Sequence, residues 1–127
     1  MNIMTGMLIE TQSYDLQAQI FKVLTHPVRL AILEILREGE HCVCHMEAHL
    51  GFRQAYISQQ LAVLREAGLI QYRRDGWNIF YRVTDARIYA VLDAVQNFTG
   101  QGRLEVNQTE ISCFCPKCSM EGLRALK

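Results

Sequence analysis

The fold is decided by residues 53–70, RQAYISQQLAVLREAGLI. Ile57, Leu61 and Leu64 recur at intervals of four and three residues, which places them on one face of a helix. Gly68 can take the left-handed backbone conformation that commonly ends a helix. The spacing therefore predicts a helix with a core-facing stripe, ending at Ala67 and Gly68 and followed by the start of a strand.

The other face of this helix carries side chains that suit contact with DNA. Glutamine, serine, tyrosine and arginine side chains bond to base edges and phosphates. An ordinary surface helix can have the same two faces, so the segments around it must support the interpretation. We expect the DNA-contacting residues here to be Arg53, Gln54, Tyr56, Ser58, Gln59 and Gln60.

Two runs after Gly68 predict a β-hairpin, because apolar and polar residues alternate in each of them. Asp75-Gly76 between the runs offers the positive-φ turn that a hairpin needs. We expect Arg73 and Arg74 near its tip to approach phosphates or the minor groove, the alternative being a solvated edge protected by charge. The residues that alternate are Ile70, Tyr72, Ile79, Tyr81 and Val83 on one side of the pattern, and Gln71, Arg73, Asn78, Phe80 and Arg82 on the other.

Four further helices are expected, near residues 14–24, 28–36, 43–50 and 88–98. Pro27 suits the first turn of the second, and Thr84 or Asp85 can cap the last. The helix at 43–50, stopped by Gly51, would form a helix-turn-helix pair with the helix after it. The last helix carries an apolar stripe that needs a partner, either a second subunit or the chain's own core; the stripe comprises Ile88, Val91, Leu92, Val95 and Phe98.

The order LREAGLI and then QYRRDGWNIFYRV resembles the winged helix-turn-helix of the ArsR/SmtB family of metal-responsive repressors, over roughly residues 16–98. The segment EHCVCHM, residues 40–46, resembles that family's thiol metal box, Glu-Leu-Cys-Val-Cys-Asp-Leu, with His41, His45 and Met46 as departures. The resemblance implies a mainly α fold with a small β-wing, a homodimer formed by the first and last helices, and double-stranded operator DNA as partner. The family's other common metal site, on the last helix, lacks its histidines here.

The cysteines predict a thiolate site for a metal or metalloid ion. Cys42 and Cys44 lie at a helix start, where both sulfurs can face one ion, and the position where some family members carry a further thiol is Glu47. We expect the missing ligands to come from Cys113, Cys115 and Cys118 in the tail. As(III) is the first choice, Cd(II) or Pb(II) the next, and Zn(II) requires a fourth thiolate or a histidine.

Other roles for the thiols and imidazoles stay open. The tail could hold a separate structural zinc, the cysteines could form a redox pair, or they could have no role. His41, His45 and His49 are spaced by four and would share a helix face, either as a zinc face or as exposed residues. His26 is expected to be structural or exposed rather than a ligand.

Length and composition predict one domain with two flexible ends. The chain has 127 residues, half of them hydrophobic, and zero net charge, so any basic face must be local. We divide it into a flexible arm (1–12), a DNA-binding and dimerisation domain (13–98) and a flexible cysteine-containing tail (99–127). Five cysteines and no long apolar segment predict a cytoplasmic protein without membrane contact.

The leading hypothesis is a dimeric repressor, not an enzyme, that leaves its operator when a thiophilic ion binds. The nearest rival is a redox-sensing repressor of the same fold. A small thiol oxidoreductase is the alternative from another class, but it would want Cys-x-x-Cys at a βα junction, which Cys115 and Cys118 do not provide.

Overall fold

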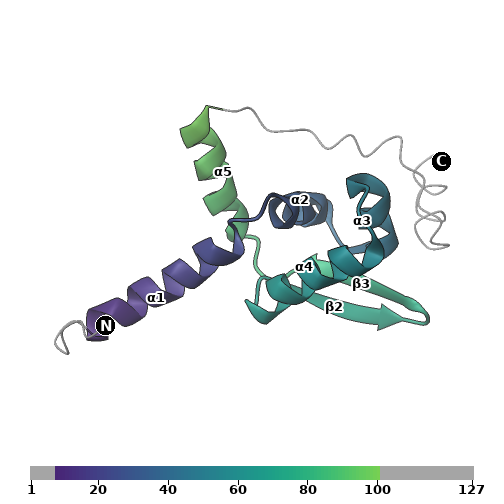
Figure 1. The fold of residues 1–127 in the computed structure, drawn as a ribbon, viewed down its shortest axis with the longest axis horizontal. Helices are drawn as coiled ribbons and strands as arrows, with labels where there is room; N and C mark the ends of the chain where they lie inside the picture. The colour runs from purple at the N-terminus through teal and green to yellow at the C-terminus, as the bar shows by residue number, and fades with distance from the viewer. Residues whose placement is uncertain (1–7, 101–127) are drawn as a thin grey trace.

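The computed structural model describes residues 8–100, with side chains from residue 13 onward (Figure 1). Helices dominate, and a small antiparallel sheet lies at one end. The elements in chain order are α1 (Leu8–Val23), α2 (Pro27–Ile35), the 3₁₀ turn η2 (Leu36–Glu38), β1 (His41–Cys42), α3 (Val43–Leu50), α4 (Gln54–Glu66), β2 (Ile70–Asp75), β3 (Asn78–Val83) and α5 (Ile88–Thr99). The predicted mainly α fold with a winged helix-turn-helix is confirmed.

The core forms where α2, α3 and α4 pack together and the first residue of β2 closes the cluster. Side chains with 2% exposure or less come from all four elements: Ile32, Leu33, Ile35, Met46, Ile57, Leu61, Leu64 and Ile70. Burying each such side chain is worth about 1.5–3 kcal/mol. The helix-turn-helix pair is therefore held by its own apolar faces.

The predicted end of this helix, α4, at Ala67 and Gly68 is confirmed in detail. Gly68 has φ of 79° and its N–H donates to the Arg65 carbonyl, while the Leu69 N–H donates to the Leu64 carbonyl at 3.0 Å. These two bonds are the paired bonds of a Schellman cap, which satisfies carbonyls that the helix leaves open. The cap directs the chain from α4 into β2 with only residues 67–69 between them.

The wing is part of a three-stranded sheet, so the prediction of two strands was incomplete. β1 pairs with β3, with Cys42 opposite Phe80, and the strand order is β1-β3-β2. Phe80 is 4% exposed and packs with Cys42 and Cys44, whereas Tyr72 is 48% exposed. Phe80, which alternates with Ile79 and Tyr81, is therefore buried as well, because Cys42 on the neighbouring strand β1 and Cys44 pack against it.

Polar contacts fix α5 against α2. The Tyr89 hydroxyl donates to the Leu33 carbonyl at 2.6 Å, and the Arg37 guanidinium lies 4.3 Å from the centroid of the Tyr89 ring. Arg37 also bonds Glu34 and Asp93. The helix is capped at Arg87, without a side-chain cap bond, rather than at Thr84 or Asp85. Asp85 instead accepts the Arg87 N–H at 2.9 Å.

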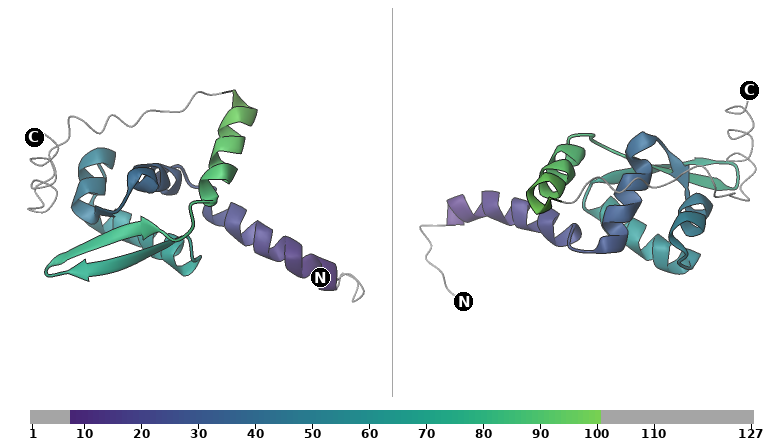
Figure 2. Two further views of the ribbon diagram at one scale, coloured as in Figure 1. Left: turned by 180° about the vertical axis from the view of Figure 1, so that it is seen from behind. Right: turned by 90° about the horizontal axis from the view of Figure 1, so that it is seen from above.

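The chain ends differ from expectation at one side. α1 already begins at Leu8, within the stretch assigned to the arm, and it extends away from the body (Figure 2). Of the stretch assigned to the tail, Thr99 ends α5 and Gly100 caps it, and residues 101–127 with the three cysteines lie outside the described residues. Among the described residues, none of the helices is both long and apolar enough to cross a membrane.

Candidate functional site

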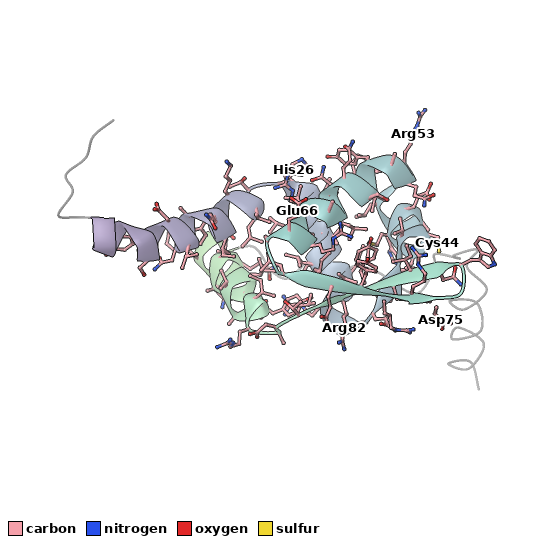
Figure 3. All side chains as sticks on the ribbon, turned by 90° about the horizontal axis from the view of Figure 1, so that it is seen from below. His26, Cys44, Arg53, Glu66, Asp75 and Arg82 are labelled. Carbon is pink, nitrogen blue, oxygen red and sulfur yellow. The ribbon has the colours of Figure 1, made fainter. Side chains whose placement is uncertain are left out.

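The start of α4 presents an open polar face. Gln54, Ser58 and Gln59 are exposed, and Arg53 precedes the helix with an exposed side chain that projects away from the body (Figure 3). The opposite face, with Ile57 and Leu61, is fully buried. α4 therefore offers four of its predicted DNA-contacting side chains to solvent on a rigid support.

Tyr56 is half-buried and held by aromatic neighbours. Its hydroxyl lies 3.3 Å from the His26 Nε2, and its ring centroid lies 5.1 Å from that of Phe52. His26 thus positions a side chain of the polar face, which agrees with the structural role expected for it.

Gln60 is turned toward the core rather than toward solvent. It is 8% exposed, and its Oε1 accepts from the Arg29 Nε at 2.8 Å. Arg29 also donates to the Val23 carbonyl at 3.1 Å, so Gln60 joins the start of α2 to α4. The structure therefore places Gln60 apart from the exposed residues with which the sequence grouped it.

The two predicted wing arginines have different surroundings. Arg73 bonds both carboxylate oxygens of Glu40, with its Nε at 2.9 and 2.8 Å, and its guanidinium lies 4.8 Å from the centroid of the Phe80 ring. Arg74 is exposed on the same strand. Arg74 is therefore available for a phosphate, while Arg73 also fastens the wing to the residue just before β1.

Sequence reasoning missed a third residue of the wing, Trp77. Its side chain is 102% exposed, the most open large apolar side chain among those described. Trp77 occupies the turn between the strands, where no alternation pattern could assign it a face. Its full exposure became visible only from the structure.

The thiols of the predicted metal box lie together. The Cys42 and Cys44 sulfurs are 2.6 Å apart, with Cys42 buried and Cys44 half-buried at the start of α3. A helix N-terminus favours negative charge, which suits a pair of thiolates. Among the described residues, no three His, Cys, Asp or Glu side chains are arranged so that they could hold a metal ion. Cys113, Cys115 and Cys118 lie outside the described residues, so their part in the site stays a prediction.

Three histidine rings lie next to one another beside the thiols. The His41 and His45 rings are stacked, with centroids 4.2 Å apart, whereas the His49 ring is tilted by 54° against that of His45, with centroids 4.4 Å apart. Burial, with the neighbouring imidazoles His41 and His49, lowers the pKa of His45 from 6.5 to about 4, and burial lowers the pKa of His49. The imidazole of His45 is therefore neutral at pH 7.

The outer side of α5 and the end of α1 form an apolar groove. It is lined by Phe21, Ala90, Val91, Ala94, Val95 and Phe98. Phe98 is 92% exposed and Val95 53%, whereas Ile88 and Leu92 pack into the chain's own core. The single apolar stripe expected on this helix is thus two faces, one already buried and one open.

Comparison with known proteins places the described region in context. The family model described as bacterial regulatory protein, arsR family, matches residues 26–72, which comprise α2, the thiol box and both helices of the helix-turn-helix. A biofilm growth-associated repressor of Xylella fastidiosa is 44% identical over 78 residues, covering 61% of this chain and 68% of that protein.

Two solved structures extend the similarity to the whole described fold. The homodimeric winged helix-turn-helix DNA-binding domain Mb0332 of Mycobacterium bovis is 25% identical, with a TM-score of 0.64 over 83% of this chain and 100% of that chain. Reduced HlyU of Vibrio cholerae is 26% identical, with a TM-score of 0.64 over 75% of this chain and 99% of that chain.

Proposed function

The chain belongs to the ArsR family of bacterial transcriptional repressors, and from this premise we propose that it binds operator DNA as a homodimer and leaves it when a thiophilic ion binds Cys42 and Cys44. As(III) is the first choice of ion, and Cd(II) or Pb(II) the next. The observation that carries the proposal is the 2.6 Å separation of the two sulfurs at the start of the helix-turn-helix.

The sulfur pair fits one soft ion with little backbone change. Two thiolates on a tetrahedral zinc stand roughly 3.7 Å apart, given a Zn–S bond of about 2.3 Å. The present separation is about 1 Å shorter, which rotation about the Cα–Cβ bonds can supply. Two sulfurs leave a three-coordinate As(III) one ligand short and a tetrahedral ion two short. The tail thiols Cys113, Cys115 and Cys118 are our proposed source of the remainder.

The position of the pair supports coupling to DNA by two routes. Cys44 is in the first turn of α3, which packs directly on α4. Cys42 is paired with Phe80 of β3, and Arg73 covers the Phe80 ring. An ion that moves the two sulfurs would therefore act on both α4 and the wing. A coupling free energy of about 1–3 kcal/mol between ion and DNA binding is enough to change operator occupancy many-fold.

The open groove on α1 and α5 supports the dimer. Phe21, Val95 and Phe98 are exposed in a single chain, and contiguous apolar surface of this kind marks interaction sites. The Mycobacterium bovis domain of the same fold is homodimeric. A twofold dimer would present two copies of α4 to a palindromic operator.

A redox-sensing repressor is the second candidate function. The same sulfur separation is also close enough for a disulfide, whose bond length is about 2.05 Å. A solved structure of similar fold, HlyU of Vibrio cholerae, is described as reduced. Oxidation of Cys42 with Cys44, or of either with a tail cysteine, would then replace ion binding as the signal.

The experiment uses the full chain, a duplex selected by it from a random pool, and As(III), Cd(II), Pb(II) or Zn(II) added under reducing conditions. Fluorescence anisotropy of the labelled duplex follows release, and thiolate charge-transfer absorption follows ion binding. We expect Cys44→Ser to bind the duplex as the wild type does but to stay bound when ion is added. Deleting residues 112–127 should weaken ion binding without changing affinity for the duplex.

Two controls separate the ion from the disulfide. Diamide in the presence of a chelator tests oxidation alone, and mass measurement of the intact protein shows whether two hydrogens are lost or an ion is gained. Release by ion under reducing conditions, without loss of mass, supports the metal-responsive repressor. A Cys42→Ser/Cys44→Ser variant that is released at the same ion concentration as the wild type would refute the site.

A further inference from the structure

The wing ends in a side chain that the fold does not use. Trp77 is the chain's one tryptophan, and its indole is fully exposed. Tryptophan is highly buried on average because its large apolar surface is costly to leave in water. A fully exposed indole at the most protruding point of the described residues therefore calls for a partner that those residues do not supply.

The hairpin geometry fixes where this indole stands. Asp75 and Asn78 are the last paired residues of β2 and β3, so Gly76 and Trp77 alone form the turn. Gly76 has φ of 61°, the left-handed conformation that the first position of such a tight turn requires. Figures 1 and 2 show the hairpin extending past α3, with its turn as the outermost point of the described residues at that end. Trp77 is thus held on a short, stiff support.

The turn lies at the same end of the molecule as the start of α4. In Figure 3, Arg53 at the start of α4 and Asp75 at the end of β2 both lie toward this end. The chain connects the other ends of α4 and β2 through the Schellman cap at Gly68, so the two elements run back alongside each other. A duplex contacted by Gln54 and Gln59 in its major groove would therefore meet the wing turn at a neighbouring groove.

The chemistry of the indole matches a minor groove over A·T pairs. Its N–H is a donor with no acceptor function, and A·T pairs present only acceptors on the minor-groove side. A G·C pair adds the guanine amino group, a donor that would face the indole N–H. The groove is narrow, about 6 Å, and apolar side chains often wedge into it between base steps. Arg74, exposed beside the turn, supplies a charge for the phosphates.

We infer that Trp77 enters the minor groove of the operator next to the segment contacted by α4 and gives the protein a preference for A·T pairs there. The inference rests on the proposed DNA binding and adds to it a sequence-determining contact from the wing. Arg74 would set affinity through charge, and the indole would set selectivity at the flank.

The single tryptophan makes the test direct. The full chain is reduced, freed of metal by a chelator and mixed with a duplex that it selects from a random pool. Binding is measured independently by the anisotropy of a label on the duplex. At saturation we expect the tryptophan emission to change and acrylamide quenching to fall, because the indole leaves bulk water.

Variants then separate the N–H from the apolar surface. Replacing A·T by G·C in the flanks should weaken wild-type binding about fivefold or more, within the range for single mismatched pairs. Trp77→Phe should keep most of the affinity but lose the A·T preference, because phenyl has no N–H. Trp77→Ala should weaken binding about tenfold with an unchanged salt slope, whereas Arg74→Ala should reduce that slope by about 1.8, or about 0.9 for each chain of the dimer. Circular dichroism checks that the fold of each variant is intact.

Two results would overturn the inference while leaving DNA binding in place. One is an indole that acrylamide quenches equally with and without saturating duplex. The other is a Trp77→Phe variant that discriminates between A·T and G·C flanks as the wild type does. If the anisotropy measurement detects no duplex binding at all, the proposed function fails and this inference fails with it.

Discussion

Phe98→Ala tests the proposed dimer at the most exposed side chain of the apolar groove. Phe98 is 92% exposed in the single chain and lines the groove on α5, so its removal takes nothing from the core. Burying a phenylalanine side chain is worth about 1.5–3 kcal/mol, and a twofold interface contains each contact twice. The loss is therefore at least about 3 kcal/mol, or roughly a hundredfold in the dimer dissociation constant.

The assay is sedimentation equilibrium over a range of protein concentrations, with circular dichroism on the same samples. We expect the wild type to be a dimer, and Phe98→Ala to be a folded chain that dissociates within the range. Operator affinity should fall with the fraction of dimer, because each chain alone contacts only half of the site.

Leu92→Ala is the matched control on the same helix. The sequence grouped Leu92 with the interface, but it is 8% exposed and belongs to the core cluster. Its truncation should lower the free energy of unfolding by about 2–5 kcal/mol through the cavity it leaves. A Phe98→Ala variant with the wild-type dissociation constant, or a wild type that is monomeric throughout, would refute the assignment of the groove to the dimer.

Three further predictions concern α3, α4 and the wing. Lowering the pH from 7 to 4.5 should destabilise the protein by about 1–2 kcal/mol through His45, a value reduced for its half-exposed ring. The pKa of His45 is lowered from 6.5 to about 4, so its contribution to stability is intact above pH 6.5 and is lost as the pH falls toward 4. Urea unfolding in the presence of a chelator should therefore show a smaller loss in His45→Gln, and an equal loss would contradict this. Gln60→Ala should lower the free energy of unfolding by about 1–3 kcal/mol, because Arg29 loses its buried acceptor. Gln59→Ala should leave the melting temperature unchanged but weaken the binding free energy by about 1–3 kcal/mol on the operator and by little on random DNA. Identical behaviour of the two variants would count against the division of α4 into two faces. Arg74→Ala should weaken binding to operator and random duplexes alike, and a titration at several salt concentrations that gives the wild-type slope would exclude a phosphate contact.

The extent of sequence prediction follows from how local each signal is. The bounds of α3 and the end of α4 could be predicted, because helical periodicity and glycine conformation act over a few residues. The burial of Gln60 was also within reach, since it lies three residues after Ile57 and four before Leu64, on the edge of the same stripe. The polar side chain concealed that position.

Other features required the third dimension. β1 has only two residues, too few for any alternation, and it exists because His41 and Cys42 meet Tyr81 and Phe80 about forty positions later in the chain. The division of α5 into a buried and an open face likewise depends on how closely α2 approaches it. Apolar periodicity predicted the helix but could not indicate which of its apolar side chains are buried against the chain's own core.

The pairing of β1 with β3 also bears on which route would carry a signal from the proposed ion site. The Arg73–Glu40 pair joins the wing to the residue before β1, but the side chains are 48% and 27% exposed, so water limits its contribution to about 1 kcal/mol or less. The packing of α3 on α4 instead involves Met46, Ile57 and Leu61, which are fully buried. A shift of α3 that changes only a fraction of these buried contacts can reach the 1–3 kcal/mol that useful coupling needs. Arg73→Ala should therefore leave most of the ion response intact, and a response that disappears in this variant would assign the signal to the wing.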